Sequence, residues 1–98
     1  MTLRIDPEQN EIKALKDVAE WRGLRVLEIG CGDGRLTRRI VRLGANVQAI
    51  DPDTDRIKAA RQLLPKSFAS RVRFEVGSSQ RLTHPRGTFD LVLFAWSL

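Results

Sequence analysis

The sequence has one cysteine and one histidine among its 98 residues, Cys31 and His84. A single cysteine cannot form an internal disulfide, and the two residues together cannot supply the clustered ligands of a zinc site. No apolar run approaches the roughly 20 residues of a membrane-spanning helix, and the first residues lack the apolar stretch and cleavage site of a secretory signal. We therefore expect a cytoplasmic protein with no bound metal and no membrane association.

Aromatic residues are also scarce, at 6%, and none stands among the arginines that dominate the net charge of +5. Single-stranded nucleic acids are commonly bound by positive charge combined with aromatic side chains that stack on bases. Four arginines fall instead on the polar side of an expected helix: Arg35, Arg38, Arg39 and Arg42. We interpret them as a solvated helix face, and nucleic-acid binding as the weaker alternative.

The most informative stretch, residues 26–37, reads Val-Leu-Glu-Ile-Gly-Cys-Gly-Asp-Gly-Arg-Leu-Thr. It combines an apolar strand, a turn with glycines at 30, 32 and 34, and the start of a helix. Glycines let the backbone turn sharply and approach a ligand, and the N-H groups of such a turn suit a carboxylate or another polar group. A dinucleotide fingerprint needs its third glycine at position 35, where this chain has Arg35. The spacing favours S-adenosylmethionine, with an NAD-dependent dehydrogenase as a weaker alternative.

Apolar periodicity and capping residues predict alternating helices and strands along the chain. A leading helix within residues 1–23 is expected to begin at Asp6-Pro7 and to end at Gly23. Strands are expected over 24–29, 46–50, 72–76 and 89–94, and further helices over 34–43 and 53–64. This order predicts one α/β domain, a doubly wound Rossmann-like parallel sheet with strand order 3-2-1-4.

Asp51 follows the second expected strand and stands about 20 residues after Gly32. In a doubly wound sheet, an acidic side chain at this place accepts hydrogen bonds from two ribose hydroxyls. An aspartate before a proline is also a common helix cap, so both interpretations stay open. The neighbouring glycine turn favours the ribose role.

With these motifs the chain resembles the class I S-adenosylmethionine-dependent methyltransferases. The resemblance is carried by residues 28–34, by Ile50-Asp51, and by residues 89–93, which read Phe-Asp-Leu-Val-Leu. It implies that the turn at 30–34 holds the methionine end of S-adenosylmethionine, that Glu28 supports the turn, and that Asp51 binds the ribose. Cys31, as a small side chain in the turn, and Pro52, beside Asp51, complete this part of the expected site.

Residues 73–82 resemble the family's third motif, in which an aspartate usually bonds the adenine amino group. This chain has Ser78 there, followed by Ser79, and a serine hydroxyl accepts such a bond more weakly than a carboxylate. The chain also lacks the Asn/Asp-Pro-Pro-aromatic signature after the last expected strand. That absence argues against methylation of adenine or of glutamine side chains, and no residue identifies a catalytic group or the methyl acceptor.

The family fold normally has seven strands, whereas this sequence predicts four. The last, over residues 89–98, would be an exposed apolar edge strand, and one face of the sheet would be nearly bare. We therefore expect residues 1–98 to form the cofactor-binding half of a methyltransferase domain. The alternative is a noncatalytic S-adenosylmethionine-binding or interaction module, completed by a partner chain or by self-association through the last strand.

Overall fold

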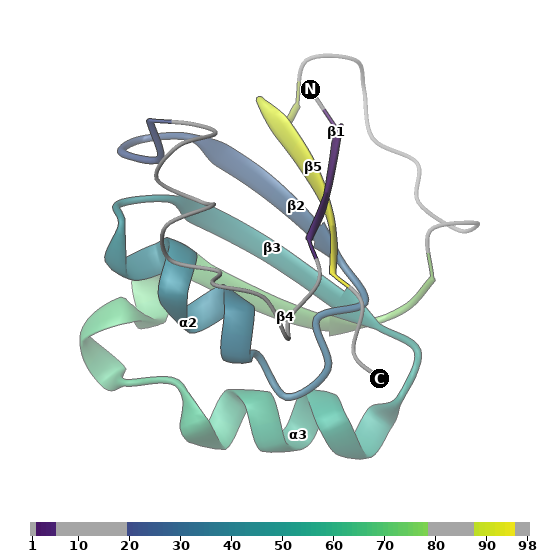
Figure 1. The fold of residues 1–98 in the computed structure, drawn as a ribbon. Coiled ribbons are helices and arrows are strands. Elements are labelled where there is room, and N and C mark those ends of the chain that lie inside the picture. The colour runs from purple at the N-terminus through teal and green to yellow at the C-terminus, as the bar shows by residue number, and fades with distance from the viewer. Residues whose placement is uncertain (1, 6–19, 79–87, 96–98) are drawn as a thin grey trace.

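The computed structural model describes residues 2–5, 20–78 and 88–95, which form one five-stranded parallel sheet with helices packed on it (Figure 1). Its elements are β1 (Thr2–Ile5), β2 (Arg25–Ile29), α2 (Arg35–Arg42), β3 (Asn46–Asp51), α3 (Thr54–Leu63), the 3-10 helix η1 (Lys66–Arg71), β4 (Val72–Val76) and β5 (Leu91–Ala95). The sheet order is β1-β5-β2-β3-β4. Strands β4-β3-β2-β5 confirm the predicted order 3-2-1-4. No helix in the described ranges is long and apolar enough to cross a membrane.

The strand β1 corrects the expectation that the last strand is an exposed edge. It pairs in parallel with β5, with Thr2 opposite Val92 and Ile5 opposite Ala95. The last strand is therefore not an exposed edge, and the open edge proposed for self-association is occupied by β1. Of the helix expected from Asp6 to Gly23, residues 6–19 lie outside the described part, and residues 20–23 form a turn rather than the end of a helix. A four-residue segment carries too little periodicity to reveal a strand whose partner lies at the far end of the chain.

The helices α2 and α3 lie on the same face of the sheet (Figure 1). Side chains at helical spacing, Leu36 with Ile40 and Ile57 with Ala60, are buried against that face. The strand side chains beneath them alternate along each strand, as the pleat requires. They belong to the same buried cluster: Val26, Val47, Ala49, Phe74, Leu91 and Leu93.

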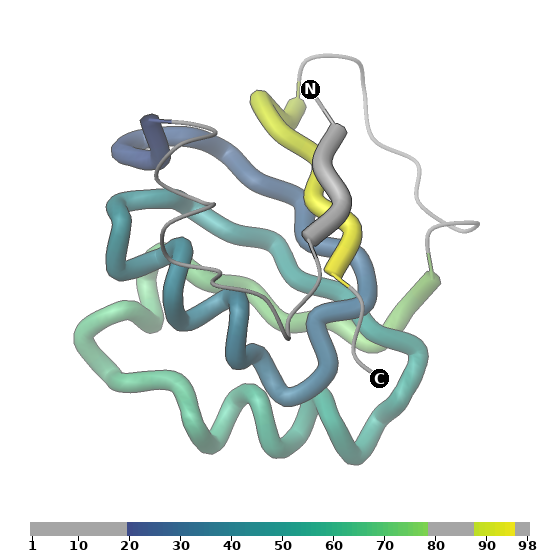
Figure 2. The backbone as a smooth tube through the Cα atoms, viewed as in Figure 1, coloured from purple at the N-terminus to yellow at the C-terminus, as the bar shows by residue number. Residues whose placement is uncertain are grey.

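The starts of α2 and α3 both follow the carboxyl ends of strands, at the same end of the sheet (Figure 2). Gly34 precedes α2 in the left-handed conformation. Asp53 caps α3, because its side chain accepts hydrogen bonds from the backbone N-H groups of Asp55 and Arg56 at 3.0 and 3.2 Å. The helix-cap role considered for Asp51 therefore belongs to Asp53, and the Asp51 carboxylate is available for another purpose.

Candidate cofactor-binding site

The turn between β2 and α2 requires glycine for two reasons: its backbone φ angles are positive, and at Gly30 a side chain has no room. Gly30, Gly32 and Gly34 have φ angles of 80°, 56° and 85°, a region that side-chain-bearing residues rarely adopt. At Gly30 a Cβ atom would also lie 2.6 Å from the Ala95 carbonyl oxygen of β5. The backbone of the turn therefore packs directly against the end of β5.

Several N-H groups of the turn donate hydrogen bonds within the protein. Gly30 and Cys31 both donate to the Ile50 carbonyl oxygen of β3, at 2.9 and 3.0 Å. Gly34 donates back to the Cys31 carbonyl oxygen at 3.0 Å. The turn is thus attached to the neighbouring strand and closed on itself, and these three groups are not the ligand donors that the sequence suggested.

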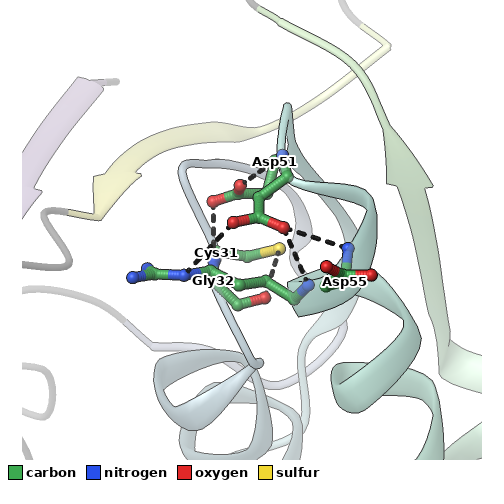
Figure 3. A network of polar contacts seen from close by, with 6 residues as sticks. Cys31, Gly32, Asp51 and Asp55 are labelled. Carbon is green, nitrogen blue, oxygen red and sulfur yellow. Dashed lines mark hydrogen bonds and ion pairs between the residues drawn. The ribbon is translucent and has the colours of Figure 1, made fainter.

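Asp51, at the end of β3, contacts the glycine turn, which lies apart from it in the sequence (Figure 3). Its Oδ2 accepts a hydrogen bond from the Gly32 N-H at 2.9 Å, and its Oδ1 accepts one from the Asp53 N-H at 2.9 Å. Only 6% of the residue is exposed. Each carboxylate oxygen can accept a second hydrogen bond, so both retain capacity for a hydroxyl group. The structure therefore fixes the Asp51 carboxylate against the glycine turn.

The donors left for a ligand are at Asp33 and at the start of α2. Within the described part of the chain, the Asp33 N-H has no acceptor, while the Asp33 carbonyl oxygen accepts a 2.8 Å hydrogen bond from Arg38 Nη1. The first turn of α2 contains no acidic residue, and a helix start carries a partial positive charge. This part of the site suits an anionic group such as a carboxylate.

Glu28 and Thr37 join the strand before the turn to the helix after it. Both are fully buried, and the Thr37 hydroxyl donates a hydrogen bond to Glu28 Oε1. The bond links the two ends of the glycine turn, and the expected role of Glu28 in the cofactor site stays a prediction. Sequence reasoning did not assign a role to Thr37, although its place in the first turn of the expected helix, on the side facing the strand, was the available signal.

The Cys31 side chain is 5% exposed, and its thiol donates to the Gly32 carbonyl oxygen at 3.6 Å. Burial, together with the nearby carboxylates of Glu28 and Asp51, raises the pKa of the Cys31 thiol far above its usual value. The thiol therefore stays protonated and is not a nucleophile at neutral pH. Its structural contribution is a small buried side chain within the turn.

The remaining expected residues follow the ends of β3 and β4. Pro52 is exposed directly after Asp51, and Ser78 is half-buried two residues after β4. The Gly77 N-H donates to the Asp51 carbonyl oxygen at 3.0 Å, which places Ser78 at the same edge of the sheet as Asp51. Ser79 lies outside the described residues.

A parallel sheet with a glycine turn and an acidic residue at its carboxyl edge defines a Rossmann-like nucleotide-binding domain. A family model for the methyltransferase domain matches residues 26–98, so the chain belongs to the methyltransferase domain family.

Relatives within this family cover far more sequence than this chain. The ubiquinone biosynthesis O-methyltransferase of Methylocella silvestris is 42% identical over 71 residues, which are 72% of this chain and 27% of that protein. The protein of the same name from Rhizobium rhizogenes is 36% identical over 78 residues, 80% of this chain and 31% of its own length. An S-adenosylmethionine-dependent methyltransferase structure from Mesorhizobium loti is similar with a TM-score of 0.73 at 26% identity, covering 89% of this chain and 38% of that one. The chain therefore spans less than a third of the length of these two curated relatives.

Proposed function

We propose that this chain supplies the cofactor-binding half of an S-adenosylmethionine-dependent methyltransferase. The observation that carries the proposal is the hydrogen bond from the Gly32 N-H to Asp51 Oδ2, because it joins the expected methionine-binding turn to the expected ribose acceptor. The similar structure from Mesorhizobium loti is named an S-adenosylmethionine-dependent methyltransferase, which supports the choice of cofactor.

The residues present fit the chemistry of this cofactor. The Asp33 N-H and the start of α2 would take the methionine carboxylate, and the remaining acceptor positions of Asp51 would take ribose hydroxyls. Ser78, at the same sheet edge, would bond the adenine. When bound, the cofactor supplies an electrophilic methyl group on its sulfonium. The chain's own contribution is to hold and orient that group, since methyl transfer depends chiefly on aligning the acceptor with it.

We propose a hydroxyl oxygen as the methyl acceptor. Both curated relatives are named O-methyltransferases, and they match this chain over its glycine turn and Asp51 region. The residues that bind the acceptor would lie outside the described part of this chain. The second candidate is a noncatalytic S-adenosylmethionine-binding module completed by a partner chain, which would bind the cofactor without transferring its methyl group.

Calorimetric titration with S-adenosylhomocysteine, with NAD as the comparison ligand, tests the proposal. We expect saturable binding of S-adenosylhomocysteine and a loss of about tenfold or more in affinity for Asp51→Asn, because the replacement loses a charged acceptor. Asp55→Asn is the matched control, since it removes the same charge from an exposed position on α3 and should bind as the unaltered chain does. Circular dichroism spectra would confirm that both variants fold.

Tighter binding of NAD than of S-adenosylhomocysteine would support the dehydrogenase alternative. Equal affinities of the Asp51 and Asp55 variants would contradict the ribose role of Asp51. Transfer of a labelled methyl group to a phenol by the protein would separate the enzyme from the noncatalytic module, which should show binding alone.

A further inference from the structure

A pocket of about 330 Å³ lies at the amino ends of the strands, at the edge of the sheet opposite the glycine turn. Its walls come from the beginnings of β2, β3 and β4, from the end of η1, and from the residues just before β5. Pockets of roughly 300 Å³ and above are large enough for a small organic ligand. This pocket shares no residue with the candidate cofactor site.

Three arginines line the pocket, and an acidic neighbour compensates the charge of one of them. Asp90 accepts hydrogen bonds from Arg25, at 2.8 Å from the backbone N-H, 3.3 Å from Nε and 3.1 Å from Nη2. These hydrogen bonds lower the pKa of Asp90, so it stays ionised opposite Arg25. The Asp90 carboxylate is thus paired with Arg25.

The other two, Arg71 and Arg73, form no ion pair in the ranges that the structure describes. The Arg71 guanidinium lies 5.3 Å from the centre of the Phe68 ring, a cation-π contact that holds the group in place without neutralising it. Arg73 is exposed on β4, directly opposite Gln48 of β3. Glu75, which shares the Arg73 face of β4, is not in an ion pair with it. Among the described residues, the pocket therefore carries two arginines that form no ion pair.

Neutral donors and an apolar wall complete the lining. Amide and hydroxyl groups come from Asn46, Gln48 and Ser70, and apolar surface comes from Val72 and Phe89. The planar guanidinium group can bond two oxygens of a phosphate at once, whereas a lysine ammonium acts as a point charge. Amides and hydroxyls would bond the remaining oxygens, while the apolar wall would contact a carbon skeleton.

We propose that this pocket binds the phosphate group of a small phosphorylated molecule, held by Arg71 and Arg73. The site is separate from the proposed cofactor site, so its occupant would be neither the methyl donor nor a part of it. Free phosphate and a phosphate ester share the chemistry of the site. The ester should bind more tightly if the apolar wall contributes.

Titration of the isotope-labelled chain with inorganic phosphate and with glycerol 3-phosphate, followed by amide NMR shifts, tests the proposal. We expect saturable shifts at the pocket residues, and a loss of about tenfold or more in affinity for Arg73→Gln and for Arg71→Gln. Arg42→Gln is the matched control, because it removes the same charge from an exposed position on α2. The control should retain the affinity of the unaltered chain, and thermal unfolding would show that all three variants fold.

Tighter binding of glycerol 3-phosphate than of phosphate would identify a phosphorylated organic molecule as the ligand, and equal binding would identify the free anion. Linear, unsaturable shifts would overturn the proposal. So would an equal loss of affinity in Arg42→Gln, because the attraction would then come from the general positive charge. A short single-stranded oligonucleotide bound more tightly than either probe, with Arg42→Gln as damaging as Arg73→Gln, would also overturn it in favour of a nucleic-acid surface.

Discussion

Thr37 contributes to the candidate site without being accessible to a ligand. Thr37→Val keeps the shape of the side chain but removes the donor to the buried Glu28 carboxylate. We expect the free energy of unfolding to fall by roughly 1–3 kcal/mol, the cost of removing one hydrogen bond from a buried carboxylate. Thr37→Ser keeps the hydroxyl and should lose less than the valine variant. Urea denaturation measures both, and a valine variant as stable as the unaltered chain would show that the bond contributes nothing.

The buried thiol of Cys31 predicts a distinct dependence on pH. Burial raises its pKa in the folded chain above the ordinary value of 9.0, so the folded state keeps the proton where the unfolded state loses it. The thiol therefore contributes fully to the free energy of unfolding below pH 9.0, and this contribution falls as the pH rises above that value. Cys31→Ala should remove that decline from unfolding curves recorded between neutral and alkaline pH.

The same burial should protect the thiol from alkylation at pH 8. We expect iodoacetamide to label the native chain far more slowly than the chain in denaturant. Equal rates in the two conditions would mean that the turn opens readily and would contradict the buried position.

The candidate site could be predicted in part at the level of single residues. Gly30 and Asp51 were identified because a positive φ angle and a carboxylate at a strand end leave a signature in the sequence. The Gly32 hydrogen bond to Asp51, and the pairing of Thr37 with Glu28, could not be predicted. They depend on side-chain rotamers and on the packing of β2 against β3, which no local pattern specifies.

At the level of elements, the N-cap of α3 tests how much the segment between β3 and α3 contributes to stability. Asp53→Ala removes the side chain that accepts from the N-H groups of Asp55 and Arg56. We expect it to lower the free energy of unfolding by about 1 kcal/mol. Asp55→Ala, which removes a carboxylate near the same helix start without removing the cap, should cost less. Thermal or chemical unfolding measures the difference, and equal losses would indicate that Asp53 acts through its charge alone.

From residue 24 onward, the predicted helices and strands agree with the described structure where the sequence carried strong periodicity. The predicted strand 72–76 matches β4, and the predicted helix 53–64 exceeds α3 by one residue at each end. The strand predicted over 89–94 begins at Leu91, because Asp90 instead accepts the Arg25 side chain and backbone N-H. The 3-10 helix η1 was not predicted, since such short helices have no apolar stripe.

At the level of the whole molecule, β1 protects β5 from other sheet edges. Removing residues 1–5 would leave β5 paired with β2 alone, so its other edge would expose N-H and C=O groups, and such edges pair readily with other chains. We expect this variant to self-associate as its concentration rises, as measured by sedimentation velocity. Replacing residues 2–5 with glycine and serine separates the loss of the strand from the loss of chain length. If both variants stay monomeric wherever the unaltered chain does, the edge has no such role.

The place of β5 in the sheet also bears on how the chain is made. In the sheet, β5 lies between β1 and β2, yet it is the last of the described strands to leave the ribosome. β1 therefore has no partner strand until β5 has been synthesised. The turn at Gly30 gains its neighbour Ala95 only then as well. Contacts between the distant ends of a chain form slowly because of their loop-closure entropy. The glycine turn thus gains its final packing only after β5 has been synthesised.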